Sequence, residues 1–130
     1  MSSELELYNL LYEGVATKGY QVYDHLPLEN ETAPYPFVIV GGVTTTPAVY
    51  KDGYSGRYDV TLDIWGDRES RLKVSQIMES LVPFGQGFFA TKNYYFQGRG
   101  ASMQKRILAD TSVPDTVLTH GVLEMVFQQV

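Results

Sequence analysis

The chain has 130 residues, a common size for one domain, and we expect a single domain spanning residues 1–130 with its own core. It contains no cysteine, which excludes disulfides, thiolate metal ligands and a cysteine nucleophile. Ten Lys plus Arg against 15 Asp plus Glu give a net charge of -5, which disfavours general nucleic-acid binding because phosphate recognition needs clustered basic residues. No apolar run approaches the roughly 20 residues of a membrane span, so we expect no membrane association.

The N-terminal part of the sequence predicts one amphipathic helix followed by a loop. Ser3 and Glu6 fit a capping box at the start of a helix over residues 3–16. Its apolar residues recur at helical spacing and share one face: Leu7, Leu10, Leu11 and Val15. A short extended piece at residues 20–23 follows, and the acidic segment 24–35 with its prolines predicts a loop.

The middle of the chain predicts a pair of strands. Residues 36–46 are β-branched and apolar on both faces, which is typical of a buried strand, and Gly41 and Gly42 indicate a bulge or a close backbone approach. Residues 47–56 are expected to form a long hairpin tip. In the strand at 57–66 one face is apolar and the other mostly polar: Tyr58, Val60, Leu62 and Ile64 against Asp59, Thr61, Asp63 and Trp65.

The C-terminal half predicts a second helix and two further strands. Asp67 is expected to cap a helix over residues 68–82, with Glu69 in its first turn. A turn-rich connection follows at 83–89. Strands are then expected at 94–107 and 117–130, separated by a polar loop. This order predicts an α+β fold with a single antiparallel or mixed β-sheet of four to five strands and two helices packed on one face.

The sequence offers no group of residues suited to catalysis. Asp59 and Asp63 are about 13 Å apart along a strand at ~3.3 Å per residue, whereas carboxylates that share a proton lie about 3 Å apart and glycosidase pairs about 5 to 10 Å. His25 and His120 have no metal-ligand spacing, and neither a G-x-S-x-G elbow nor a complete phosphate-binding glycine motif is present. We therefore expect no enzyme activity, no catalytic residue, no cofactor and no metal site.

Three segments carry a resemblance to a known family: the helix LYNLLYEGV, the strand PYPFVIV, and RYDVTLDIWGDRESRLKV. In this order they resemble the small tail completion proteins of long-tailed bacteriophages, also called tail terminator or tail-to-head joining proteins. The resemblance covers residues 5–83 well and the C-terminal strands more loosely. It implies a structural virion protein that forms a ring, usually hexameric, caps the finished tail tube and joins the tail to the head connector.

The resemblance also implies partners and a location. The partners would be further copies of the chain, the major tail protein and the head-connector protein. The location would be the tail or neck of the virion, reached from the host cytoplasm during assembly. DNA would pass through the lumen of the ring without specific binding, and an acidic inner surface would favour this because like charges repel.

A ring requires a head-to-tail contact between two different complementary patches on each subunit. The sequence suggests two candidates for these patches. One is the hairpin tip, with Tyr50, Lys51, Asp52 and Tyr54, and the other is the polar strand face, with Asp59, Asp63 and Trp65. Trp65 fits either a buried interface anchor or a side chain packed under the second helix.

Three other functions stay open at this point. A minor tail or head-tail adaptor protein at another level of the neck would have a similar size and a similar ring. A small protein-binding module unrelated to phages would differ in not self-associating. A small enzyme would need polar residues assembled from separate strands, which no local motif reveals.

Overall fold

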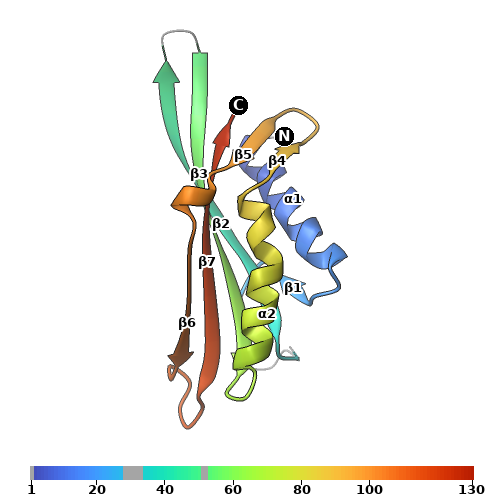
Figure 1. Cartoon of the computed structure of the whole chain (residues 1–130), viewed down its shortest axis with the longest axis vertical. Helices are drawn as coiled ribbons and strands as arrows, with labels where there is room; N and C mark the ends of the chain where they lie inside the picture. Colours follow the sequence, from blue (N-terminus) through green and yellow to red (C-terminus); the bar gives the residue numbers. More distant parts are fainter. Residues whose placement is uncertain (1, 28–33, 51–52) are drawn as a thin grey trace.

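A computed structural model describes residues 2–27, 34–50 and 53–130. Within these residues the chain forms one curled, half-barrel sheet of seven strands (Figure 1). The strands are β1 (Val22–Tyr23), β2 (Phe37–Tyr50), β3 (Gly53–Asp67), β4 (Phe88–Ala90), β5 (Tyr95–Gly98), β6 (Gln104–Asp110) and β7 (Leu118–Gln129). Their order is β1-β2-β3-β7-β5-β4, and β6 also pairs with β7. The β1–β2 pair is parallel and the other pairs are antiparallel, so the sheet is mixed.

Two α-helices lie on one side of this sheet (Figure 1). Helix α1 (Ser3–Thr17) packs against β2, and α2 (Arg71–Leu81) packs against β3 and β7. Two short 3-10 turns follow, at Val82–Gly85 and Gly100–Ser102. No helix in the described residues is long and apolar enough to span a membrane.

The core lies between the helices and the sheet. The apolar face of β3 is fully inside it, as the alternation of its residues predicts. The largest fully buried side chains come from both helices and from β3, β5 and β7: Leu7, Leu11, Tyr58, Leu62, Ile64, Leu81, Phe96, Leu123, Met125 and Phe127. The opposite face of the long strands is left without a helix.

The expected number of four to five strands is wrong. The segment expected to be one strand at residues 94–107 is two strands, because the turn at Gly100–Ser102 interrupts it. Both pieces pair with the same edge of β7, β5 at its C-terminal end and β6 along the rest. The connection expected at 83–89 also contributes β4, which pairs with β5.

The hairpin between β2 and β3 is mostly strand and not a long tip. The two strands pair as far as Tyr50 and Gly53, across a bulge at the predicted glycine pair, between Val40 and Val43. Because β7 pairs with β3 only from Arg57 onward, the paired residues 47–50 and 53–56 extend beyond the rest of the sheet as a two-stranded ribbon, at the upper end of Figure 1. We call this segment the β2–β3 ribbon.

Both predicted helix caps are corrected by the structure. Ser2, not Ser3, is the N-cap of α1, and its Oγ accepts a hydrogen bond from the amide of Leu5 at 3.2 Å. Helix α2 begins at Arg71, and Ser70 at its N-cap makes no side-chain capping bond. Asp67 is the last residue of β3, where its carboxylate accepts a hydrogen bond from the Ser70 hydroxyl. The first turn of α2 therefore contains no acidic residue.

We expect Tyr58→Phe to lower the free energy of unfolding by about 1–2 kcal/mol. The ring of Tyr58 is fully buried, and its hydroxyl is hydrogen-bonded to Ser3 Oγ and to Gln129 Oε1, each at 2.8 Å. Removal of the hydroxyl leaves these polar groups short of a partner where α1, β3 and β7 meet. Urea denaturation measures the loss, and an unchanged midpoint would contradict it. Tyr20→Phe, which removes a hydroxyl 2.8 Å from Ser80 Oγ at a half-buried site, serves as the matched control.

Candidate functional site

The sheet face turned away from α1 and α2 is the candidate site, and we call it the helix-free face. The register of β3 with β7, and of β7 with β6, determines which side chains share it. They are Asp59, Thr61, Asp63 and Trp65 of β3, His120, Val122, Glu124 and Val126 of β7, and Gln104, Arg106 and Leu108 of β6. Three of the seven residues proposed from the sequence therefore lie together on this face.

Trp65 packs against a histidine on this face. The ring centroids of Trp65 and His120 are 3.9 Å apart and the rings are 9° from parallel. His120 Nε2 lies 2.7 Å from Asp63 Oδ1, and both side chains are largely covered, with 16% and 27% of their surface exposed. Helix α2 lies on the other side of the sheet, where its Val74 and Met78 approach Gly121. Trp65 therefore does not pack under the second helix, and its role as an interface anchor stays a prediction.

The acidic side chains of the helix-free face each have a basic neighbour. Arg57 makes two hydrogen bonds to Asp59, at 3.2 and 3.1 Å, and this carboxylate raises the pKa of the guanidinium, first by hydrogen bonding and then by its charge. Arg106 lies 3.6 Å from Glu124. Exposed pairs of this kind contribute little to stability because solvent screens them. Their effect is to give Asp59, Asp63 and Glu124 a paired charge or hydrogen-bond partner on this face.

A hollow of about 280 Å³ opens on the helix-free face. Its walls are mainly polar, and its lining side chains include Arg57, Asp59, Thr61, Ser102, Gln104 and Glu124. Small-molecule sites usually enclose about 300–1,000 Å³ and are mostly apolar, so this hollow is smaller and more polar than a typical ligand pocket. A broad face with paired charges and one shallow hollow is better suited to contact with another protein.

The other predicted patch lies on the β2–β3 ribbon. Tyr54 is paired with Val49, and Tyr50 with Gly53, so both tyrosines lie in strand. Lys51 and Asp52 lie outside the described residues. Strand β3 carries Tyr54 of this patch as well as Asp59, Asp63 and Trp65 of the other, whereas Tyr50 is the last residue of β2.

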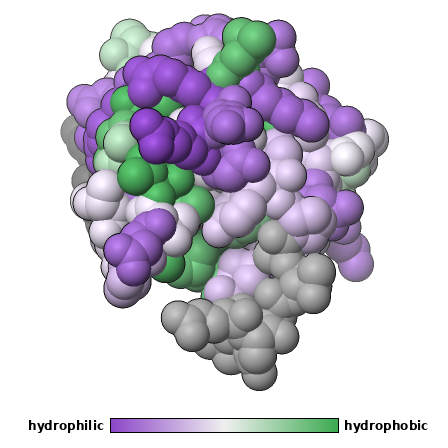
Figure 2. Space-filling model, turned by 90° about the horizontal axis from the view of Figure 1, so that it is seen from below, coloured by the Kyte–Doolittle hydropathy of each residue, from purple (hydrophilic) through white to green (hydrophobic). Residues whose placement is uncertain are grey.

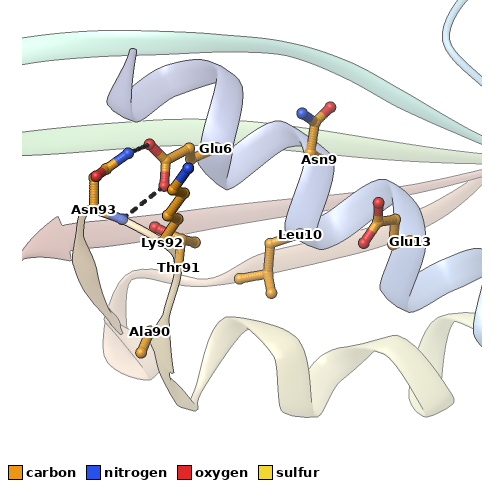
Figure 3. A pocket seen from close by; sticks show the side chains of 8 residues that line it. All are labelled: Glu6, Asn9, Leu10, Glu13, Ala90, Thr91, Lys92 and Asn93. Atoms are coloured by element: carbon orange, nitrogen blue, oxygen red, sulfur yellow. Dashed lines mark hydrogen bonds between the residues drawn. The ribbon is translucent and has the colours of Figure 1, made fainter. Parts of the chain in front are cut away.

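A second hollow, which the sequence did not predict, lies between α1 and the β4–β5 hairpin (Figure 3). We call it the α1 hollow. Its volume is about 440 Å³, and its lining residues are Glu6, Asn9, Leu10, Glu13, Ala90, Thr91, Lys92 and Asn93. The buried carboxylate of Glu6 accepts hydrogen bonds from the backbone amide of Asn93 at 3.0 Å and from its Nδ2 at 2.8 Å. These bonds attach the β4–β5 turn to α1.

We expect Glu6→Gln to destabilise the protein at neutral pH and to have less effect in acid. The Asn93 side-chain hydrogen bond is the main reason why the pKa of Glu6 is lowered below 4.5. Because the pKa of Glu6 is lowered by folding, the bond to its carboxylate stabilises the fold at pH values above the pKa that Glu6 has in the unfolded chain. This contribution is lost as the pH falls through the lower pKa of the folded protein.

Urea midpoints of the wild type and Glu6→Gln at pH 7 and pH 3 test this expectation. The difference between the two proteins should be large at pH 7 and should shrink at pH 3. Glu13→Gln, on the exposed side of the same helix, is the matched control and should show little difference at either pH. A Glu6→Gln difference that is the same at both pH values would contradict the assignment.

Among the described residues, no group of three or more His, Cys, Asp or Glu side chains could hold a metal ion. His25 pairs with Asp24 at 2.5 Å on an exposed loop, and this hydrogen bond is the main reason why the pKa of Asp24 is lowered. His120 lies on the helix-free face, in β7. The two histidines thus belong to separate parts of the chain.

Comparison with known proteins relates the chain to others by its fold. No protein-family model matches the sequence, and no curated protein matches it. Among solved structures, a chain of the structure described as "Virion of native gene transfer agent (GTA) particle" is similar, with a TM-score of 0.64 and 13% sequence identity. The match covers 99% of this chain and 96% of that chain, so the two share the fold over their whole length.

Proposed function

We propose that the chain is a structural virion protein that acts by assembly and not by catalysis. The observation that carries the proposal is the full-length fold similarity to a chain of a gene transfer agent virion. The resemblance of the sequence to phage tail completion proteins supports the same class independently, because it rests on residues and not on backbone geometry. A broad sheet face on which the charged side chains Asp59, Asp63 and Glu124 are paired suits a protein whose work is contact with other proteins.

We further propose the particular role of a tail terminator. In this role, copies of the chain form a ring, as a hexamer, on the end of the tail tube, where they contact the major tail protein on one side and the head connector on the other. The contact between neighbouring copies is head-to-tail, so each copy uses two different surfaces. The helix-free face, with Trp65 at one end, and the β2–β3 ribbon are the surfaces that we assign to contacts with the other proteins of the junction, whether further copies, the major tail protein or the head connector.

An acidic lumen built from Asp59 and Asp63 is not part of this proposal. Asp59 is hydrogen-bonded to Arg57, and Asp63 to His120. These neighbours reduce the free negative charge that would repel DNA. Asp59 and Asp63 are instead paired on the helix-free face, which lowers the cost of covering it with another subunit.

Electron microscopy of particles that lack this chain tests the role. We expect full heads and tails that are not joined, with tails of irregular length, because the tube end is no longer capped. A neck adaptor at another level, the second candidate, would leave unjoined tails of normal length. Joined particles of normal appearance would contradict both assignments.

A further inference from the structure

The first turn of α2 breaks the usual rules for a helix start. Its residues Arg71, Leu72 and Lys73, which we call the α2 ridge, include two cations and no acid, and Ser70 provides no side-chain cap. Cations near a helix N-terminus are unfavourable by about 0.3–1 kcal/mol each because of the helix dipole. Residues that break a local rule without a local benefit are often functional.

The α2 ridge is also exposed and apolar at its centre. Leu72 has 72% of its surface exposed, the largest value among the exposed large hydrophobic side chains of the described residues. At 100° per residue it lies opposite the buried stripe of Val74, Ile77, Met78 and Leu81, with Arg71 and Lys73 on either side. Neither cation makes an ion pair within the described part of the chain. Figure 2, which views the molecule from below, shows hydrophobic and hydrophilic residues intermixed on this end.

The α1 hollow has the complementary arrangement. Leu10 provides an apolar side chain, and Glu13 is an exposed acid that makes no ion pair within the described residues. In Figure 3, Glu13 lies at one end of the hollow, and Lys92 lies beside Glu6 at the other, so the cation does not neutralise Glu13. Leu10 beside the acid Glu13 is therefore complementary, in polarity and in charge, to the α2 ridge, where Leu72 lies between two basic residues.

One copy cannot make this contact with itself. In Figure 1 helix α2 begins near the lower end of the molecule, whereas α1 and the β4–β5 hairpin, which line the hollow, lie above it. We propose that the α2 ridge of one copy docks into the α1 hollow of a second copy, with Leu72 against Leu10 and the ridge cations against Glu13. This inference rests on the proposed function, in which copies meet head-to-tail. A head-to-tail contact closes into a ring when a whole number of the rotations between neighbours makes a full turn.

The absence of cysteine from the chain permits a clean crosslinking test. Leu72→Cys and Glu13→Cys are combined in one chain, and the pair is oxidised in purified protein and in assembled particles. Both positions are exposed on helices, so the fold should be kept. A disulfide requires Cα atoms within about 7 Å, so we expect a ladder of covalent oligomers. Mixing the two single-cysteine chains should give dimers and nothing larger.

Two control variants make the test specific. Glu13→Cys combined with Ala101→Cys, which is exposed far from α2 in sequence, should give no ladder. In chains that carry no introduced cysteine and therefore keep Glu13, Arg71→Glu with Lys73→Glu should weaken self-association, measured by sedimentation, by about tenfold, and adding Glu13→Lys should restore it. No ladder in either preparation, or a dimer from Leu72→Cys alone, would overturn the proposal.

The outcomes also separate this contact from the tail role. A ladder that forms while particles lacking the chain look normal would keep the contact and reject the tail role. If particles lacking the chain have unjoined heads and tails but no ladder forms, the tail role is kept and the contact is rejected. If the charge reversal weakened binding to duplex DNA and left self-association unchanged, the ridge would be a nucleic-acid contact and the proposal would be overturned.

Discussion

Replacement of Gly98 by alanine is expected to cost about 3 kcal/mol or more of unfolding free energy, at the upper end of the range for overpacked sites. A Cβ at this position would lie 2.4 Å from the carbonyl oxygen of Gly85, 2.5 Å from its carbonyl carbon and 2.8 Å from the amide nitrogen of Gln86. All three are backbone atoms, which cannot rotate away as a side chain does. The variant must therefore separate β5 from the turn at Val82–Gly85.

Gly42→Ala is the matched control for this prediction. Gly42 also lies in a strand, but a Cβ there would meet nothing within 4 Å. We expect its unfolding free energy to change by less than about 0.5 kcal/mol. Urea denaturation of both variants measures the contrast. Similar midpoints for Gly98→Ala and the wild type would contradict the close approach of β5 to the backbone of Gly85.

Trp65→Ala is expected to reduce joining of heads and tails by about 30-fold, the effect of losing about 2 kcal/mol at an interface anchor. Trp65 is a half-buried aromatic side chain on the helix-free face, where it stacks on His120. The isolated protein should lose only about 1–2 kcal/mol, because the indole is already partly exposed. The yield of joined particles and the urea midpoint of the purified variant measure the two effects.

Ile77→Val separates an interface effect from a stability effect. Ile77 is buried in α2, on the opposite side of the sheet, and its shortening should cost about 0.5–1.5 kcal/mol. This is close to the cost expected for Trp65→Ala, but joining should be nearly normal. Equal loss of joined particles in the two variants would show that stability alone is responsible, and the role assigned to Trp65 would then be wrong.

The strands with one buried face could be predicted from the sequence because their side chains alternate. In β3 the residues Tyr58, Val60, Leu62 and Ile64 enter the core, as their spacing predicts. The shorter strands β4 and β6 are mostly exposed and lie at the margin of the sheet, so no alternation identifies them. The break between β5 and β6 is the turn at Gly100–Ser102, which the sequence-based prediction does not separate from the surrounding strand.

The observed helix starts differ from the predicted ones because contacts with distant parts of the chain determine them. Two serines, Ser2 and Ser3, lie at the start of α1, and only Ser3 fits the capping-box pattern, yet Ser2 is the N-cap. Glu6 was assigned to a capping box with Ser3, but its carboxylate binds Asn93, which is 87 residues away. At α2, Asp67 is still in strand, because β3 pairs with β7 as far as Leu118. Pairing within the sheet therefore outweighs the local preference of Asp67 for a helix cap.

The candidate site could be predicted in part. The face shared by Asp59, Asp63 and Trp65 follows from the period of a strand. The pairing of Asp63 with His120 depends on the register between β3 and β7, two strands that are far apart in sequence. No sequence pattern determines this register, so the stacked histidine was not expected. The ion pair of Arg106 with Glu124 depends in the same way on the register between β6 and β7, whereas Arg57 and Asp59 are neighbours on one face of β3.

A cryo-electron microscopy reconstruction of the junction between head and tail in intact particles tests the central claim most directly. We expect a closed ring of copies of this fold on the last layer of the tail tube, with the helix-free face and Trp65 covered by neighbouring protein. A junction in which no density fits this fold, or a ring in which Trp65 is exposed to solvent, would contradict the account.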